Sequence, residues 1–268
     1  MSYKNIKYGV EDGIAEIRFD RDDIFNTMSR RDMAEEVVDA FGRVERDRDA
    51  RVLILSGEGR AFSAGGNLKD LDAGEDGFTP EPIEHRRHYF EQIQIILRAQ
   101  YACSLPMIAA VHGPAIGGGT DMAALCDIVI ATPKAVFCEM FVNLGLIPGT
   151  GGAWLMPRRI GWQAAADLLL TGRKIGGQEA FELGLAYKCV EPDQLMPTVR
   201  DYAKMIASRP PNATRFIKTL MKQGLHQTYT DVLDNCATMQ AVLQTTDDHK
   251  KALTAALNKA PTPEYSGH

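Results

Sequence analysis

The 268-residue sequence predicts an α/β fold with a largely buried sheet. Residues 52–55 and 107–111 form two short, uniformly apolar runs, which have the length and composition of strands covered on both faces. Each run is followed by a glycine-rich turn, and the second turn leads into a segment with helical character that ends near Leu125. This repeated order of buried strand, glycine turn and helix is typical of α/β proteins.

The N-terminal segment predicts two strands and a helix. Residues 5–10 and 14–20 are extended, with a Glu-Asp-Gly turn between them and a partial alternation of apolar and polar residues. Ser29, followed three positions later by Asp32, predicts a capping box for the helix that comes next. The apolar residues that recur at helical spacing in this helix are Met33, Val37, Phe41 and Val44.

The remaining pattern predicts a core followed by a helical appendage. Residues 82–102 read as a helix with Tyr89 on its apolar side. Beyond Pro211 the sequence becomes rich in helix formers, and Asn212 is predicted to cap the first helix there. We therefore expect a catalytic core over residues 1–208 and a C-terminal helical region over residues 209–268.

Composition excludes several classes of protein. The formal net charge of −5 is unlike the basic domains of non-specific nucleic-acid binders. We expect no membrane span, because the longest apolar runs are far too short to cross a bilayer, and no N-terminal leader peptide. The five cysteines are scattered without a C-x-x-C pair, which indicates reduced, mostly buried thiols and a cytoplasmic protein.

The two glycine-rich turns, residues 60–68 and 112–121, are the best candidates for a functional site. Ligand sites of α/β sheets tend to follow buried strands, and glycine lets a ligand approach the main chain closely. Two amide N–H groups that converge from such turns stabilise negative charge on one oxygen. The alternative is that both turns serve only packing. A phosphate-binding Walker A loop is excluded because Gly119, not lysine, follows Gly118.

Other ligand sites receive less support. Residues 149–152 do not complete a dinucleotide fingerprint, because Trp154 occupies the place of its last glycine. His85 and His88 are spaced for one face of a helix, but no third metal ligand is evident, so we expect no metal site.

The sequence resembles the crotonase (enoyl-CoA hydratase/isomerase) superfamily over residues 60–71, 108–127, 145–161 and 169–184 and in its C-terminal tail. The resemblance implies a spiral of ββα units with a C-terminal helical trimerisation region, and trimers or dimers of trimers. It also implies a coenzyme A thioester as substrate, with no permanently bound cofactor. By the same resemblance, the backbone amides of Gly66 and Gly118 form the oxyanion hole, and Ala64 and Gly65 contact the substrate.

The acid/base residues of the superfamily carry over only in part. The first glutamate of its hydratases falls on Asp121, which a helix N-terminus would also favour for purely structural reasons. The second glutamate falls on Phe141, expected to line the substrate pocket, and the aspartate of related isomerases falls on Gly149. Glu139 is a possible substitute. In an extended segment it would share a face with Phe141, about 6–7 Å away, although an exposed surface position is an equal alternative.

The predicted function is enoyl-CoA hydration or double-bond isomerisation through an enolate or thioester oxyanion. Burial of Asp121 against apolar neighbours is expected to raise the pKa of its carboxyl toward neutrality. Two alternatives stay open: hydrolysis of a thioester or C–C bond, assisted by Glu139, Tyr89 or the two histidines, and a non-catalytic protein that binds CoA ligands. The basic side chains considered for the CoA phosphates are Arg60, Lys69, Lys218 and Lys222.

Overall fold

The computed structural model describes residues 3–69 and 81–268. Its larger sheet has six strands in the order β1-β2-β3-β4-β6-β9, in which only the β1–β2 pair is antiparallel. The strands of this sheet are β1 (Ile6–Glu11), β2 (Ile14–Phe19), β3 (Val52–Gly57), β4 (Met107–Val111), β6 (Ile128–Ala131) and β9 (Lys188–Cys189). The predicted α/β class and the predicted strands are confirmed.

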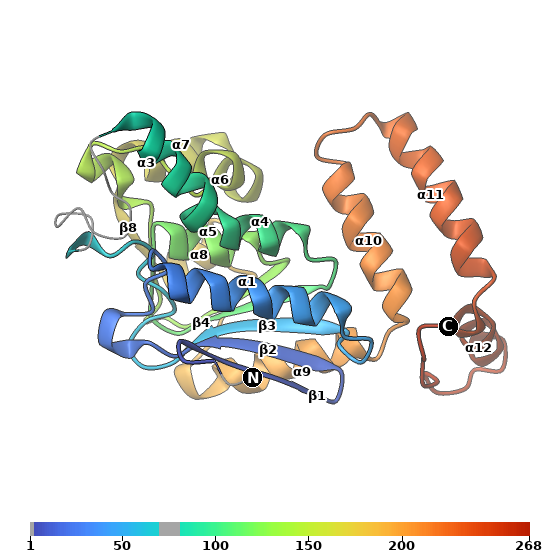
Figure 1. Cartoon of the computed structure of the whole chain (residues 1–268). Helices are drawn as coiled ribbons and strands as arrows, with labels where there is room; N and C mark the ends of the chain where they lie inside the picture. Colours follow the sequence, from blue (N-terminus) through green and yellow to red (C-terminus); the bar gives the residue numbers. More distant parts are fainter. Residues whose placement is uncertain (1–2, 70–80) are drawn as a thin grey trace.

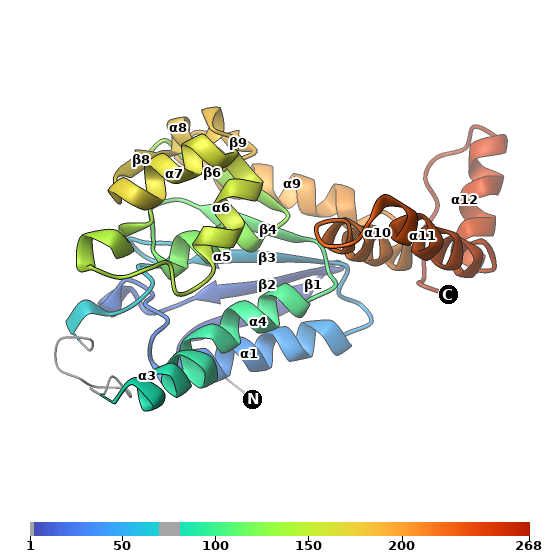
Figure 2. The same ribbon diagram turned by 90° about the horizontal axis from the view of Figure 1, so that it is seen from above.

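Both faces of this sheet are covered, as the uniformly apolar strands predicted. Leu53 and Leu55 point into a core shared with α1 (Arg31–Arg46) and α4 (Gln94–Ala102). Ile54 of the same strand points the opposite way, into a second core closed by α9 (Leu195–Ala207). Figures 1 and 2 show α1 and α4 on one side of the sheet and α9 on the other.

A second, three-stranded sheet stands beside the first and carries one of the two glycine turns. It is ordered β5-β7-β8, with β5 parallel to β7 and β8 antiparallel to it. A bridge between Ser63 and Ala115 joins the loop after β3 to this sheet. Its strands and the helices around it are β5 (Pro114–Ile116), β7 (Val136–Cys138), β8 (Lys174–Gly176), α5 (Gly118–Leu125), α6 (Gly152–Ile160), α7 (Trp162–Thr171) and α8 (Gly177–Glu182).

The helix predicted over residues 82–102 is a continuous run of three helical stretches. It begins as α3 (Pro82–His88), passes through a π-helical turn, η2 (Tyr89–Ile93), and continues as α4. π-turns widen a helix locally and occur frequently at functional sites. Three 3₁₀ turns complete the core: η1 (Asp22–Ile24), η3 (Met140–Leu144) and η4 (Pro192–Gln194).

The last three helices project from one side of the core (Figures 1 and 2). They are α10 (Pro211–Gln223), α11 (Tyr229–Gln244) and α12 (Asp247–Leu257). The C-terminal tail then folds back, because the Asp248 carboxylate accepts the backbone N–H groups of Ser266 and Gly267, each at 2.8 Å. No helix in the described ranges is long and apolar enough to span a bilayer.

Two predicted helix caps are wrong. Helix α1 begins after Arg30, and the Ser29 hydroxyl accepts a hydrogen bond from the backbone N–H of Asn67 at 3.1 Å instead of capping the helix. Helix α10 begins after Pro210, while the Asn212 side chain donates to the Gly267 carbonyl. In both cases the polar side chain forms a hydrogen bond with a residue distant in the sequence, instead of capping the helix that follows it.

Candidate active site

The two glycine turns meet in direct backbone contact. A Cβ atom on Gly65, whose φ is +71°, would lie 2.4 Å from the Ile116 carbonyl oxygen and 3.0 Å from the Gly118 nitrogen. The Ile116 N–H donates to the Ser63 carbonyl at 2.9 Å, which fixes the separation of the two turns. A side chain at position 65 would force them apart, so glycine is required there.

Gly66 and Gly118, one from each turn, lie in the wall of one cavity. Gly118 is the first residue of α5, so its N–H has no acceptor within its own helix. The positive φ of Gly117, +53°, and the bond from its N–H to the Cys138 carbonyl turn the chain into this helix. The N–H of Gly66 has no acceptor among the described residues, and both Gly66 and Gly118 lie in the cavity wall.

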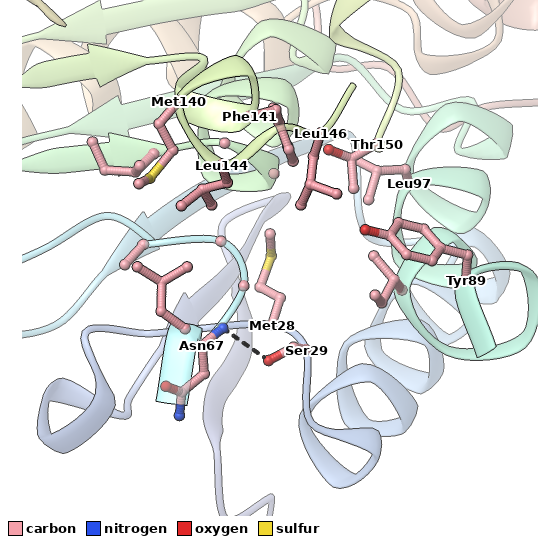
Figure 3. A pocket seen from close by; sticks show the side chains of 18 residues that line it. Met28, Ser29, Asn67, Tyr89, Leu97, Met140, Phe141, Leu144, Leu146 and Thr150 are labelled. Carbon is pink, nitrogen blue, oxygen red and sulfur yellow. Dashed lines mark hydrogen bonds between the residues drawn. The ribbon is translucent and has the colours of Figure 1, made fainter. Parts of the chain in front are cut away.

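The cavity encloses about 750 Å³, including space open to solvent, and its wall is mainly apolar. Figure 3 shows Phe141, Leu146 and Thr150 along one wall, with Met28 and Asn67 across from them. A concave, mostly apolar site with a few polar groups is the usual form of a small-molecule site. Further lining residues are Ser29, Ala64, Gly65, Leu68, Tyr89, Ile93, Leu97, Ile116, Gly117, Met140 and Leu144.

A pair of buried carboxyl groups lies behind this wall. Asp121, in the first turn of α5, is 0% exposed, and Glu139, immediately before η3, is 1% exposed. A Cβ atom on Gly152 would lie 2.8 Å from Asp121 Oδ1 and 2.8 Å from Glu139 Oε2, so the two carboxyl groups fill the space left by the missing side chain. Thr150, which lines the cavity, donates from Oγ1 to Asp121 Oδ2 at 2.5 Å.

The surroundings of the pair favour one shared proton. Burial raises the pKa of Asp121 to about 6, although hydrogen bonds with Thr150 and Glu139 and the Gly152 amide favour its ionised form. Burial, and then the negative charge of Asp121, raises the pKa of Glu139 well above its ordinary value. No donor among the described residues reaches either oxygen of Glu139 if both carboxyl groups are ionised. The pair is therefore expected to hold its proton on Glu139, which would donate it to an ionised Asp121.

Comparison with known proteins places this geometry in a family. A family model described as enoyl-CoA hydratase/isomerase matches residues 9–266. The chain belongs to the enoyl-CoA hydratase/isomerase family. This result confirms the resemblance noted in the sequence and the crotonase-like fold.

Individual members of the family align over nearly the full chain. A crotonyl-CoA hydratase from Syntrophomonas wolfei is 33% identical over 266 residues, with 97% of each chain covered. A 1,2-epoxyphenylacetyl-CoA isomerase from Escherichia coli is 30% identical, with 96% of this chain and 97% of the relative covered. The crystal structure of an enoyl-CoA hydratase from Bacillus anthracis superimposes with a TM-score of 0.91 at 30% identity, covering 99% of this chain and all of the other.

Aromatic side chains lie at both positions where the sequence resemblance predicts a carboxylate. At position 141, the Phe141 ring packs on Gly117, where an added Cβ would lie 3.2 Å from the ring. At position 149, a Cβ on Gly149 would lie 2.7 Å from the Tyr89 ring. Tyr89, carried by the π-turn, therefore takes up the space that a carboxylate side chain at position 149 would need.

The predicted site residues divide into three groups. Those in the cavity wall are Ala64, Gly65, Gly66, Tyr89, Gly118 and Phe141. Asp121 and Glu139 lie together behind the wall. Lys69 is exposed, its backbone N–H donates to the Asn67 side chain, and it is not among the lining residues.

The geometry expected for Glu139 is wrong. The chain turns into a 3₁₀ helix at this residue, so Glu139 and Phe141 do not share the face of a strand. The carboxyl group of Glu139 points to Asp121, and the alternative of an exposed surface position is excluded by its burial.

Most of the basic side chains considered for phosphates have internal partners. The Arg60 guanidinium bonds Asp22 at 3.0 Å. Lys218 is 4% exposed and pairs with Asp127 at 2.8 Å, while Lys222 donates to the carbonyls of Tyr101 and Cys103. These contacts compete with binding to a ligand.

The two histidines of α3 are not at the cavity. His85 stacks on Tyr89, with ring centroids 5.6 Å apart, and His88 is buried. Neither is among the residues of the cavity wall. Within the described part of the chain, no three His, Cys, Asp or Glu side chains are grouped so that they could hold a metal ion.

Sequence reasoning missed Thr150 and Ser29. Thr150 follows Gly149 directly, so a hydroxyl one residue beyond the empty aspartate position was the available signal. Ser29 was assigned to a helix cap, but it supports the loop that carries Gly66.

Proposed function

We propose that the cavity binds an acyl-CoA thioester with its carbonyl oxygen between the N–H groups of Gly66 and Gly118. Both amides belong to the wall of one cavity, and the turns that carry them are locked together by backbone contacts. Preorganised amides of this kind stabilise an enolate oxygen strongly, and removal of one donor typically costs about 10²–10³ in rate. The names of the relatives, which include a crotonyl-CoA hydratase and a 1,2-epoxyphenylacetyl-CoA isomerase, support a CoA thioester as the substrate class.

The proposed reaction is a double-bond shift between the β,γ and α,β positions of an enoyl-CoA. Removal of an α-proton gives an enolate, and return of the proton to the γ-carbon completes the shift. One acid/base unit performs both transfers in turn. The observation that carries this proposal is that one buried carboxyl pair, Asp121 with Glu139, adjoins the cavity through Thr150. The sequence resemblance puts the second hydratase glutamate at Phe141, which has no carboxyl group.

Water addition makes a different demand on the site. A hydratase must activate water and also deliver a proton to the α-carbon, and each positioned acid/base group is typically worth about 10²–10⁴ in rate. Phe141 contributes an aromatic ring to the cavity wall at the position where the sequence resemblance predicts the second carboxylate of a hydratase. We therefore expect hydration of crotonyl-CoA to be much slower than the double-bond shift.

The test is incubation with 2-enoyl-, 3-enoyl- and saturated acyl-CoA thioesters in deuterated water, followed by mass spectrometry and chromatography. We expect 3-enoyl-CoA to become 2-enoyl-CoA of the same mass, with no water added and no CoA released. Water addition to 2-enoyl-CoA, with no conversion of 3-enoyl-CoA, would identify a hydratase. Release of free CoA would indicate a hydrolase, and binding without any conversion would indicate a non-catalytic CoA-ligand binder. Each of these three results would contradict the proposed reaction.

We further propose a homotrimer or a dimer of trimers assembled through the C-terminal helices. These helices project from the core and expose large apolar side chains, among them Ile217 at 56%, Met221 at 67% and Leu257 at 75%. Exposed apolar surface of this extent is typical of an interaction site. Light scattering at micromolar concentration is expected to give at least three times the mass of one chain, and a monomer would contradict this assembly.

A further inference from the structure

Thr150 connects the cavity to the buried carboxyl pair. We propose that the Thr150 hydroxyl is the group that touches the substrate and passes protons between the acyl chain and Asp121. The proposal rests on the proposed double-bond shift and names the side chain that performs the transfer. Thr150 would thus be a catalytic residue, and Glu139 a positioning residue that acts through Asp121.

The position of Thr150 over the oxyanion amide supports this role. A Cβ atom on Gly118 would lie 3.4 Å from Thr150 Cγ2 and 3.5 Å from Thr150 Oγ1, so the threonine side chain packs directly above the residue that supplies one amide. A carbonyl oxygen bound at the Gly118 N–H places the adjacent α-carbon beside this side chain. The loop is fixed there, because the Gln94 side chain donates to the Gly149 carbonyl at 3.0 Å.

The buried pair reaches the cavity by way of this hydroxyl. Asp121 and Glu139 are 0% and 1% exposed, and neither is among the residues that line the cavity. The Asp121 oxygen that faces the cavity wall, Oδ2, accepts the Thr150 hydroxyl at 2.5 Å. A bound acyl chain therefore meets the threonine oxygen before it meets either carboxyl group.

The Thr150 hydroxyl does not cap the helix that follows it. Threonine before a helix commonly caps the first turn by accepting a backbone N–H. Helix α6, which follows Thr150, has Gly151 as its N-cap and no side-chain capping bond. The hydroxyl proton of Thr150 is instead directed to the carboxylate, so the oxygen lone pairs stay available to accept a proton.

The proton transfer balances without any further reactant. The α-carbon gives its proton to Thr150 Oγ1 as the hydroxyl proton moves to Asp121 Oδ2, and the electron pair of the broken C–H bond forms the enolate. Asp121 becomes neutral, and the new negative charge resides on the thioester oxygen at the two amides. In the return step Asp121 gives its proton back to Thr150, which protonates the γ-carbon. Glu139 keeps its own proton throughout and donates it to Asp121 whenever Asp121 is ionised.

The test compares Thr150→Val, which keeps the shape of the side chain but removes the hydroxyl, with Thr150→Ser, which keeps the hydroxyl. The matched control is Thr132→Val, which removes a buried threonine hydroxyl bonded to the His112 carbonyl away from the cavity. With a 3-enoyl-CoA substrate, we expect Thr150→Val to lower kcat about 10²–10⁴-fold with KM changed less than about threefold. Thr150→Ser should stay within about tenfold of the unmodified protein, and Thr132→Val should retain its kcat.

The pH profile tests whether the Thr150 hydroxyl and the Asp121 carboxyl group act together. The groups around Asp121 are the Thr150 hydroxyl and Gly152 amide from the α6 side and Glu139 from the chain before η3, with the Cys138 thiol next to Glu139. The Thr150 hydrogen bond holds the pKa of Asp121 down, so its removal should move the acidic limb of the residual kcat/KM profile to higher pH. The pH profile of Thr150→Ser should match that of the unmodified protein.

The outcomes separate this proposal from the reaction it rests on. If the unmodified protein shifts the double bond and Thr150→Val does so at a similar rate, the relay is wrong while the proposed reaction stands. Equal loss in Thr150→Val and Thr150→Ser would also overturn the relay, because shape and not the hydroxyl would then matter. If the unmodified protein converts no 3-enoyl-CoA, the proposed function fails, and the relay fails with it.

Discussion

Replacing the two buried carboxyl groups by their amides should have opposite consequences for activity. Glutamine has the shape of a protonated glutamic acid and still donates a hydrogen bond, so Glu139→Gln preserves what Glu139 supplies if that residue is neutral. Asparagine cannot accept a proton, so Asp121→Asn removes the base itself. The two side chains adjoin the same residue, Gly152, and differ in exposure by only one percentage point. Burial alone therefore cannot account for a difference between the variants.

The size of the difference follows from the electrostatics of the pair. Two like charges about 4 Å apart repel by about 4 kcal/mol at an effective dielectric constant near 20, compared with about 1.4 kcal/mol for a tenfold change in an equilibrium. The pair therefore carries one charge at neutral pH, located on Asp121, which has the Thr150 donor. We expect Asp121→Asn to lower kcat about 10²–10⁴-fold and Glu139→Gln to lower it less than about tenfold.

The assay is kcat/KM for conversion of 3-enoyl-CoA to 2-enoyl-CoA between pH 5 and 8. The unmodified protein should lose activity below about pH 6, where Asp121 becomes protonated. Glu139→Gln should keep an acidic limb of this kind, because Asp121 is unchanged. If Glu139→Gln at pH 7.5 is as inactive as Asp121→Asn, the assignment of the proton to Glu139 is refuted.

Three further outcomes are expected. Gly118→Pro should lower kcat by at least about 10²-fold, because it removes an oxyanion donor at a first helical position that tolerates proline. Gly118→Ala keeps the N–H and should stay within about tenfold of the unmodified protein. Similar kcat values for the two variants would refute the oxyanion assignment. The stability of Asp121→Asn relative to the unmodified protein should rise between pH 4 and pH 7. The pKa of Asp121 is raised from 3.8 to about 6 in the folded state, so ionisation of this buried carboxyl destabilises the unmodified protein as pH rises. The gain should be at most about 3 kcal/mol in urea unfolding at matched protein concentration, and a gain that shrinks with rising pH would contradict the pKa shift. Phe141→Glu should raise crotonyl-CoA hydration at least about tenfold over Phe141→Gln, and equal rates would show that position 141 does not reach the water site.

The parts of the fold that the sequence predicts are those set by short-range pattern. The apolar runs of β3 and β4, the glycine turns after them and the helix over 82–102 all follow from residue type and spacing. The two turns can converge only because residue 65 is glycine. This need cannot be seen in the sequence, since it arises from the Ile116 carbonyl oxygen, which would lie 2.4 Å from a Cβ atom on residue 65.

The acid/base site could be predicted only in part, because its geometry depends on contacts between distant segments. Asp121 was found through its family position, but the meeting of Asp121 with Glu139 depends on the 3₁₀ turn after Glu139 and on the absence of a side chain at Gly152. Thr150 lies 29 residues from Asp121, and its hydroxyl carries no local signal of a role. Ser29 shows the same limit, since a serine before a helix predicts a cap until the loop at Asn67 is placed beside it.

The most direct test of the account is the fate of the α-proton. With 3-hexenoyl-CoA that carries deuterium at its α-carbon, NMR should show 2-hexenoyl-CoA with part of that deuterium moved to the γ-carbon and no water added, and Asp121→Asn should abolish the shift. This result would establish an enolate that is formed and reprotonated by the buried carboxyl pair. A γ-carbon that receives only hydrogen from the solvent, or conversion that persists in Asp121→Asn, would contradict it.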